Sequence, residues 1–325
     1  MCTAANYKTH CHYFGRTLDL EHAYYAMSVT VTPRNFPLRF RKVRDLKLHY
    51  AMIGMATVAE LYPLYYDATN EMGLSIAGLN FPQNAEYKQI EEGMDNIAPF
   101  EFIPWILGQC ANVEEARILL KRMNVIKMEF HPSVPLTSMH WLISDREQSI
   151  TVEPVCSGLN VYENPVGILA NNPQFGTQLS NLNNYIGLSR ETPCNRFSNA
   201  LKLECDSCGM GALGLPGDFS SASRFARAAF VLLNSVSGES ESESISQFFH
   251  VMDVVKQPRG CVQAENREYM VTLYTSCCNT DKGLYYYTTY ENRQISCVDL
   301  HRENLSGNRL ASYPLVWRQQ IRLCN

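Results

Sequence analysis

The sequence has no apolar run long enough to cross a membrane. No stretch reaches the roughly 18 consecutive apolar residues that a spanning helix requires. The N-terminal segment contains neither the basic region nor the apolar region of a secretory signal. We therefore expect no membrane insertion, and a protein that resides in the cytoplasm.

The sequence also has little net charge. Its 28 Lys and Arg residues are offset by 32 Asp and Glu residues, which gives a net charge of -4. A chain without a positive excess is not drawn to nucleic acids or anionic membranes, so we expect neither as a partner. The basic stretch at residues 34–47 is interpreted as a solvated hairpin between strands, with contact to an anionic partner as the alternative.

No repeat of 20–50 residues and no compositional boundary divides the chain, which predicts a single domain over residues 1–325. Short segments rich in β-branched and aromatic residues, bounded by turn-forming residues, are typical of strands. They occur at residues 25–32, 50–57, 73–79, 139–144, 149–154, 269–276, 283–290 and 294–299.

Apolar residues at helical spacing predict helices at residues 113–123, 221–235 and 245–255. Asn112 and Glu115 are placed as an N-cap and its partner, and residues 100–110 suggest a buried helix. The acidic segment at residues 238–244 is interpreted as a solvated loop. Two helical blocks among many strands predict an α+β fold, with helical layers over antiparallel sheet.

Twelve cysteines are many, but their spacing is irregular. In a cytoplasmic chain we expect most of them to be reduced and to pack as small apolar residues. Cys205 and Cys208 lack the second ligand pair of a zinc site, and the G-x-G-x-x-G at residues 209–214 lacks the helix that a nucleotide site requires. We therefore expect no metal and no cofactor; a cysteine-rich zinc protein is the alternative, which elemental analysis would test.

What the sequence does have is a cysteine at position 2. Removal of Met1 would give Cys2 a free α-amine beside its thiol, so one residue would supply both nucleophile and base. A nearby Arg16 favours a thiolate, and a nearby Asp19 can hold the amine. From these residues alone, an ordinary penultimate cysteine remains the better interpretation.

Eight short motifs change that interpretation, because their order and spacing over nearly the whole chain resemble the choloylglycine hydrolase family. This family contains the conjugated bile acid hydrolases and the penicillin V acylases, which are N-terminal-nucleophile hydrolases. The motifs are Met1-Cys2-Thr3, Phe14-Gly15-Arg16 with Asp19, Pro33-Arg34-Asn35-Phe36, Gly78-Leu79-Asn80-Phe81-Pro82, Asn171-Asn172-Pro173, Gly214-Leu215-Pro216-Gly217-Asp218, Ser223-Arg224-Phe225 and Tyr274-Thr275-Ser276-Cys277.

The resemblance implies a four-layer αββα sandwich with two central antiparallel sheets. It implies that Met1 is removed and that Cys2 is the nucleophile. It further implies that Asn80 and Asn171 form the oxyanion hole. The polar residues that it places around Cys2 are Arg16, Asp19 and Arg224.

The resemblance implies a bacterial enzyme that hydrolyses glycine- or taurine-conjugated bile salts. Bile salt hydrolases typically carry Asn at position 80, as here, whereas penicillin V acylases often carry Tyr. Penicillin V acylase activity is the alternative enzyme, and a non-catalytic binder of steroid acids is the alternative from another class. The resemblance also implies a homo-oligomer, a homotetramer in many members.

Apolar residues at the mouth of the site are expected to contact the steroid. The candidates by family position are Leu18, Ala59, Tyr66, Val134 and Met139. Plain core packing is an equally good interpretation of each of them, because such residues are routinely buried. Tyr66 differs from the residues common at its position, which leaves the preferred bile acid open.

Overall fold

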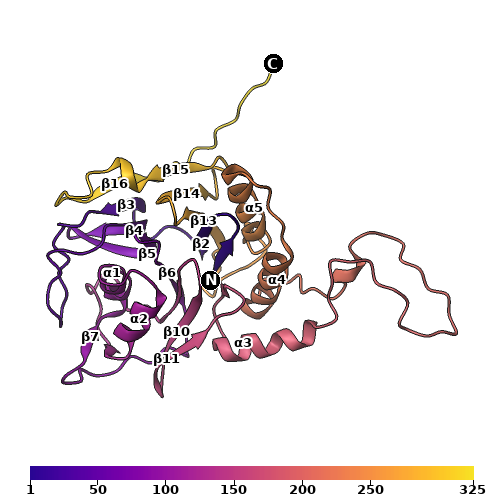
Figure 1. Cartoon of the computed structure of the whole chain (residues 1–325), viewed down its shortest axis with the longest axis horizontal. Helices are drawn as coiled ribbons and strands as arrows, with labels where there is room; N and C mark the ends of the chain where they lie inside the picture. Colours follow the sequence, from indigo (N-terminus) through magenta and orange to yellow (C-terminus); the bar gives the residue numbers. More distant parts are fainter.

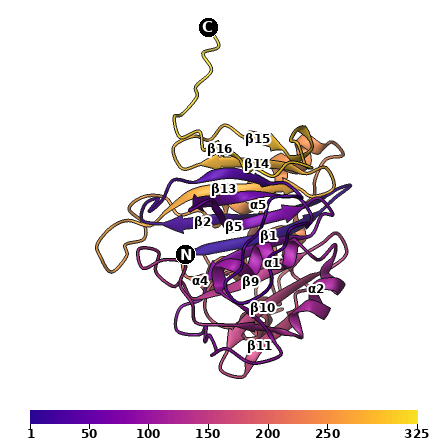
Figure 2. The same ribbon diagram turned by 90° about the vertical axis from the view of Figure 1, so that its left-hand side faces the viewer.

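Two antiparallel sheets form the centre of the protein (Figures 1 and 2). The computed structural model describes residues 1–325. The six-stranded sheet runs in the order β12 (Ile168–Leu169), β1 (Cys2–Lys8), β2 (His12–Leu20), β13 (Val271–Asn279), β14 (Leu284–Thr289) and β15 (Ser296–Asp299). The eight-stranded sheet runs in the order β11 (Gly158–Glu163), β10 (Ser149–Val155), β9 (Met139–Ser144), β6 (Ser75–Asn80), β5 (Tyr62–Asn70), β4 (Met52–Ala59), β3 (Ser28–Thr32) and β16 (Ala311–Pro314).

Helices cover the outer face of each sheet. α1 (Phe102–Leu107) contacts β5 and β6, and α2 (Val113–Leu120) lies beside it on the same side of the molecule (Figure 1). α4 (Ser221–Asn234) and α5 (Glu241–Asp253) contact strands of the six-stranded sheet, with α3 (Phe175–Asn181) against α4. A short parallel pair, β7 (Asp95–Ile97) and β8 (Met123–Val125), completes the fold. The predicted four-layer αββα sandwich is confirmed.

Strand alternation builds two separate apolar cores. On β9, Leu142 faces the core that the two sheets share, whereas Trp141 and Ile143 face the layer of α1 and α2. The Trp141 ring stacks on Phe102 of α1, with ring centroids 3.8 Å apart. Because both faces of the sheet are covered, its central strands are buried almost continuously.

The helix at residues 113–123 begins where the sequence predicts. Asn112 caps α2, and its side-chain oxygen accepts a hydrogen bond from the Glu115 N–H at 3.0 Å. The helix ends at Leu120, three residues earlier than expected. Met123 instead begins β8, and its backbone pairs with β7 and not with the preceding helical turn.

Two further boundaries differ from the prediction. The segment at residues 25–32 becomes a strand only at Ser28, because Tyr25 and Met27 turn toward a cavity instead. The acidic segment at residues 238–244 is not all loop: α5 begins at Glu241. Ser240 and Glu243 form a capping box there, and each side chain bonds the other residue's backbone N–H.

The expectation that most cysteines pack in the core is also wrong. Only Cys2, Cys110, Cys277 and Cys278 are buried, and Cys11 and Cys205 are partly covered. The other six are exposed, since they lie in turns, at the sheet edge and in the C-terminal tail, where no layer covers them. They are Cys156, Cys194, Cys208, Cys261, Cys297 and Cys324.

The basic stretch at residues 34–47 links β3 to β4. An antiparallel bridge joins Leu38 to Leu46, as a hairpin would, but both of these side chains are buried. Arg34 makes a bidentate ion pair with Glu71, and the Arg41 guanidinium lies over the Phe130 ring. Part of the stretch is therefore packed against the protein and is not wholly solvated.

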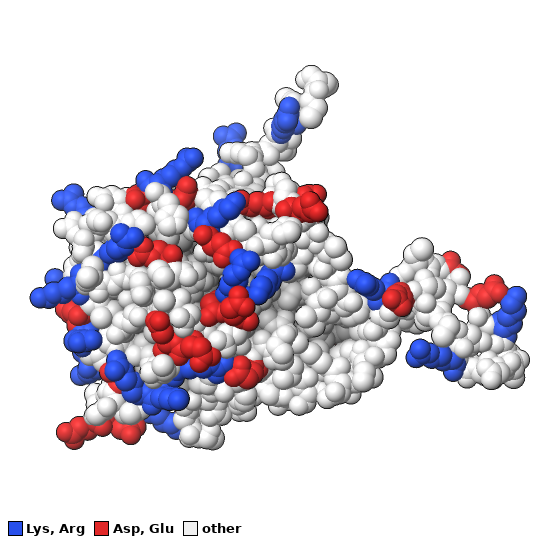
Figure 3. Space-filling model, in the orientation of Figure 1, with Lys and Arg blue, Asp and Glu red and all other residues white.

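An arm formed by residues 186–213 projects from the body between α3 and α4 (Figure 1). Ser189 donates a backbone hydrogen bond to Gly211 at 2.8 Å, which joins the two ends of the arm. Basic and acidic side chains are interspersed on the arm and on the visible face of the body (Figure 3). No helix in the protein is both long and apolar enough to cross a membrane.

Candidate active site

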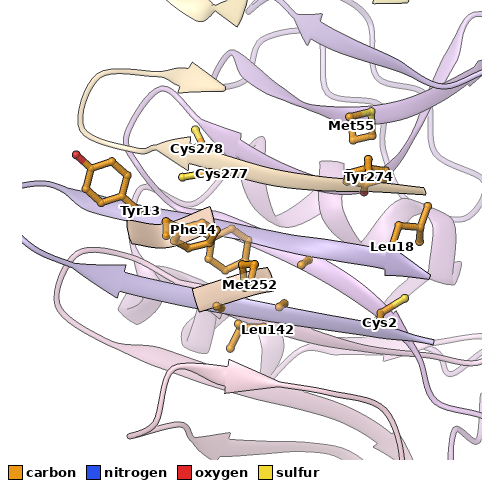
Figure 4. Close-up of a cluster of buried hydrophobic side chains, with 14 of the residues drawn as sticks. Cys2, Tyr13, Phe14, Leu18, Met55, Leu142, Met252, Tyr274, Cys277 and Cys278 are labelled. Atoms are coloured by element: carbon orange, nitrogen blue, oxygen red, sulfur yellow. The ribbon is translucent and has the colours of Figure 1, made fainter. Parts of the chain in front are cut away.

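The β1–β2 hairpin places Cys2 at the end of an inner strand. In the strand register Cys2 lies opposite Leu18, and Ala4 lies opposite Arg16. Figure 4 shows Cys2 and Leu18 together at one end of these neighbouring strands. Arg16 and Leu18 point to the same side because strand residues two apart share a face. Cys2 is only 3% exposed, so its thiol lies at the floor of the site.

Arg224 ties the nucleophile strand to helix α4. Ser220 caps this helix, which sets Arg224 in the first turn beside β1. The buried guanidinium donates to the Cys2 carbonyl at 2.5 Å, to Thr3 Oγ1 at 2.6 Å and to Asn171 Oδ1 at 2.7 Å. Burial lowers the pKa of Arg224, and the nearby Asp19 opposes that shift. Arg224 therefore acts as a cationic brace behind Cys2.

Asn171 joins Cys2 to Asn80. Its Oδ1 accepts a hydrogen bond from the Cys2 N–H at 2.8 Å, and its Nδ2 donates to the Asn80 carbonyl at 2.6 Å. Its own backbone N–H donates to Ser221 Oγ at 2.8 Å. An amide nitrogen has two hydrogens, so one N–H of Asn171 remains available for a bound oxyanion.

Arg16 is the second buried guanidinium of the site. Its side chain donates to the carbonyls of Tyr66, at 3.0 Å, and of Gly78, while its Nη2 is buried without a hydrogen-bond partner. Burial opposes the charge of Arg16, but the negative groups around it, Cys2 and Asp67 among them, outweigh burial and raise its pKa. Arg16 is therefore a permanent positive charge with one free donor.

Asp19 is a buried carboxylate with one free oxygen. Thr272 Oγ1 donates to its Oδ1 at 2.6 Å, whereas Oδ2 is buried and has no partner. Burial raises the pKa of Asp19, and Arg224 and the chain's N-terminal ammonium oppose that rise. A free acceptor beside the N-terminus is suited to bind an ammonium group.

Met1 extends strand β1 by one residue. Its ammonium donates to the Asp19 carbonyl at 2.6 Å, and the Asp19 N–H donates back to the Met1 carbonyl at 2.9 Å. In this form the Cys2 nitrogen belongs to a peptide bond and cannot act as a base. Met1 also lines the cavity in front of Cys2, so its removal would both free the amine and enlarge the cavity.

A cavity of about 380 Å³ opens in front of Cys2, and 20 of its 28 lining residues are hydrophobic. Volumes of this order are typical of sites for small molecules. The cavity brings together most of the residues that the sequence predicts for the site. They are Cys2, Arg16, Leu18, Tyr66, Asn80, Val134 and Met139.

Four predicted residues do not line this cavity. Asp19, Asn171 and Arg224 lie behind Cys2 and act through the contacts given above. Ala59 lies at the hairpin end of β4, two residues beyond Thr57, which is the last residue of that strand to line the cavity. Ala59 therefore does not line the cavity, and its contact with the steroid stays a prediction.

Three comparisons with known proteins bear on this geometry. Residues 2–313 match the family described as linear amide C–N hydrolases, choloylglycine hydrolase family. The chain belongs to this family. A bile salt hydrolase/transferase of Lactiplantibacillus plantarum is 52% identical over 315 residues, covering 97% of both chains. One of Clostridium perfringens is 39% identical and covers 96% of both chains.

Two solved structures share the fold. A crystal structure of a mutant conjugated bile acid hydrolase from Clostridium perfringens superposes with a TM-score of 0.92 at 37% identity, over 100% of both chains. A penicillin V acylase from Agrobacterium tumefaciens gives a TM-score of 0.74 at 20% identity, over 96% of this chain and 90% of the other. The second likeness concerns the fold alone.

Asp67 completes the polar cluster of this family member and was missed from the sequence. It is 2% exposed, and its carboxylate accepts hydrogen bonds from Tyr274 at 2.7 Å and from Tyr285 at 2.6 Å. Burial raises the pKa of Asp67, whereas Arg16 lowers it. An Asp in the middle of an apolar strand was the available signal, since a buried charge needs a partner.

No group of three or more His, Cys, Asp or Glu side chains is arranged to hold a metal ion. The C-x-x-C pair at Cys205 and Cys208 lies on the projecting arm, with Cys208 exposed to solvent. The chemistry available at the site is therefore that of a thiol, two guanidinium groups, two amides and two carboxylates.

Proposed function

We propose that the protein hydrolyses the amide bond of glycine- or taurine-conjugated bile salts, with Cys2 as the nucleophile. The observation that carries this proposal is the position of Cys2, at the polar end of an otherwise apolar cavity. A conjugated bile salt has matching parts, namely a large apolar steroid and a polar amide at its end. The family membership and the names of the relatives support the same substrate.

Removal of Met1 is the first requirement of the proposed mechanism. The freed α-amine takes the thiol proton of Cys2, directly or through water. Asn171 Oδ1, which already holds the Cys2 nitrogen at 2.8 Å, orients this amine. The free oxygen of Asp19 offers the resulting ammonium a second acceptor, while Arg16 and Arg224 favour the thiolate.

The thiolate then attacks the amide carbonyl and forms a C–S bond. The oxygen of the tetrahedral intermediate carries the negative charge, which the free N–H of Asn171 and the side chain of Asn80 stabilise. One such donor typically accounts for about 3–4 kcal/mol of transition-state stabilisation. The C–N bond breaks as the Cys2 ammonium gives its proton to the leaving nitrogen. Glycine or taurine departs, and the steroid acid remains as a thioester.

Water completes the reaction in a second step. The Cys2 amine, neutral again, takes a proton from water, and the hydroxide attacks the thioester carbonyl. The same oxyanion donors stabilise the second intermediate. The C–S bond breaks, the free bile acid leaves, and Cys2 regains its proton. No metal or organic cofactor enters either step.

The proposal is tested by incubating protein of verified N-terminal mass with taurocholate, glycocholate and penicillin V. We expect the bile conjugates to be cleaved with the higher specificity constants, because Asn80 and the apolar cavity match them. Faster cleavage of penicillin V would instead make the protein a penicillin V acylase. Binding of bile salts without any cleavage would make it the non-catalytic steroid-acid binder.

Two cysteine variants test the nucleophile. Cys2→Ser is expected to lose essentially all hydrolysis, whereas Cys110→Ser is expected to keep it. Cys110 is a matched control because it is also 3% exposed but belongs to the core beneath α1 and α2. Equal activity of Cys2→Ser and the parent would remove Cys2 from the mechanism.

The requirement for a free amine has its own test. A cleavable peptide placed before Cys2 should keep the protein inactive until a protease removes it. Activity that appears in proportion to the mass of the Cys2-terminal species supports the amine as base. Full activity before cleavage would show that the amine is dispensable.

We also propose that the protein assembles as a homo-oligomer, a tetramer, through the arm of residues 186–213. The arm exposes large apolar side chains that the body does not cover: Ile186 is 89% exposed, Phe197 80% and Leu213 79%. Exposed apolar side chains that gather on one element mark a contact surface, and these lie on one projecting arm. Light scattering should give a tetramer for the parent and a smaller species for Phe197→Ser; unchanged tetramers would contradict the role of the arm.

We place the reaction in the bacterial cytoplasm. A thiol nucleophile and exposed cysteines remain reduced most readily there, and the bile salt hydrolase relatives come from bacteria. Cell fractionation of the native host tests this placement, and activity found mainly outside the cells would contradict it.

A further inference from the structure

His140 is a fully buried histidine directly behind the two asparagines of the site. It lies on β9, in the register position opposite Leu79, and is 0% exposed. Its ring stacks on Phe81, which follows Asn80, with the centroids 4.2 Å apart and the planes 6° from parallel. On its other side, Nε2 lies 2.8 Å from the carbonyl oxygen of Ala170, the residue before Asn171.

The partners of His140 define which atoms carry hydrogen. A carbonyl oxygen only accepts, so Nε2 carries a proton and donates it to Ala170. Nδ1 lies 3.1 Å from Oε1 of Glu153, which is also 0% exposed. A hydrogen bond at this distance requires a hydrogen on one of these two atoms.

Glu153 extends this contact to a third segment. Its Oε1 also accepts the backbone N–H of Phe175 at 2.9 Å, at the start of α3. The other oxygen, Oε2, is buried without a partner. The pair therefore connects β9 and β10 of the eight-stranded sheet to the chain on both sides of Asn171, which follows β12 of the six-stranded sheet.

We propose that His140 is a positioning residue of the oxyanion hole, holding the Asn80 and Asn171 segments at a fixed separation. The inference rests on the proposed function, since it assigns these asparagines to the oxyanion. Asn80 comes from one sheet and Asn171 from the edge of the other, and sheets packed face to face can slide by fractions of an ångström. His140 contacts the chain next to both asparagines and removes that freedom.

The contact matters because oxyanion donors act only in the correct place. A displacement of about 1 Å at a reacting group can cost on the order of a hundredfold in rate. The Asn171 Nδ2 to Asn80 carbonyl bond of 2.6 Å already joins the two residues, but it uses the donor group that must also face the oxyanion. The connection through His140 uses the Ala170 carbonyl and the Phe81 ring, so it leaves the Asn171 amide free to face the oxyanion.

The first test compares His140→Phe with His12→Phe. Phenylalanine at position 140 keeps the stack on Phe81 but removes the donor to Ala170. His12 is the matched control: it is 1% exposed and bonds Thr280 and Ser144 instead of either oxyanion segment. We expect kcat of His140→Phe to fall about a hundredfold with KM changed less than about threefold. His12→Phe should keep its kcat at an equal folded fraction.

The rate at which iodoacetamide alkylates Cys2 separates positioning from general disruption. Alkylation uses the thiol but needs no oxyanion hole, so His140→Phe should react at the parental rate. An alkylation rate that falls in parallel with kcat would overturn the proposal, as would an unchanged kcat. The ratios of kcat between variant and parent are measured on whichever amide the parent cleaves. If that amide is penicillin V and not a bile salt, the substrate assignment is refuted, but the ratios still test the role of His140.

Glu153→Gln gives a test that does not depend on His140→Phe folding. In Glu153→Gln the amide oxygen can take the place of Oε1 and keep the hydrogen bond from the Phe175 N–H, while His140 keeps its proton on Nε2 and its bond to Ala170. We expect kcat within about threefold of the parent. Glu153→Leu removes both bonds and should lose at least about tenfold in kcat. Equal kcat values for the Gln and Leu variants would contradict the positioning role.

Discussion

Replacement of Arg224 by methionine tests the brace behind Cys2. Methionine fills most of the volume but leaves the Cys2 carbonyl, Thr3 Oγ1 and Asn171 Oδ1 without the donors that now lie 2.5–2.7 Å away. It also deprives the buried Asp19 of a nearby positive charge. Both effects act at positions that water cannot reach, so both destabilise the folded protein.

The size of the loss follows from these contacts. A hydrogen bond from a charged donor contributes about 1.5–3 kcal/mol, and Asn171 Oδ1 retains the Cys2 N–H and so loses less than the other two acceptors. Loss of the charged donor at two buried acceptors, the Cys2 carbonyl and Thr3 Oγ1, therefore gives about 3–6 kcal/mol, and we expect Arg224→Met to fall in that range. Native proteins have about 5–15 kcal/mol of stability, so a folded population should remain.

Urea unfolding and steady-state kinetics provide the assay. Arg224→Met should unfold at lower urea with an unchanged slope, and its kcat should fall at least about tenfold because Asn171 loses one of its anchors. Arg227→Met is the matched control on the same helix. Arg227 bonds the carbonyls of Val254, at 2.7 Å, and Pro216, at 2.6 Å, and does not contact the site. A parental midpoint and kcat for Arg224→Met would refute this reasoning.

Three further predictions concern buried groups. Burial lowers the pKa of His12 from 6.5 to about 4, so between these pH values the unfolded chain binds more protons than the folded one. The free energy of unfolding of the parent should therefore fall by about 3 kcal/mol as pH falls through this window. His12→Gln should not show this pH dependence in urea unfolding. Asp67→Asn should lower kcat and the urea midpoint together, because Arg16 loses its buried counter-charge; a change in neither would contradict that role. Phe102→Ala should cost about 3–5 kcal/mol by calorimetry, since Phe102 is fully buried and stacks on Trp141; an unchanged unfolding temperature would contradict this.

Local sequence signals predicted much of the fold. The cap at Asn112, the strand at residues 139–144 and the helix at residues 221–235 each depend on neighbours within a few positions, and each is confirmed to within three residues. The capping box at Ser240 was an equally local signal. It was missed because the alternating Ser and Glu residues around it are also typical of a solvated loop.

Prediction of the site residues required information about contacts between distant parts of the chain. No pattern along the chain predicts that Asp67 meets Tyr274 and Tyr285, because these contacts exist only once β5 faces the strands β13 and β14 across the sandwich. His140 and Glu153 were missed for the same reason. The site residues came from resemblance to a family, whose motifs carry long-range pairings that composition and periodicity do not.

The arm leaves and re-enters the body at nearly the same point, where the Ser189 N–H meets the Gly211 carbonyl at 2.8 Å. Its two ends are thus fixed by the sandwich, whatever lies between them. Each doubling of the length of a flexible loop costs only about 0.6 kcal/mol. The arm is therefore a natural place to graft a binding peptide or to attach a label, and a change in its length alters the surface proposed for assembly while the catalytic body stays the same.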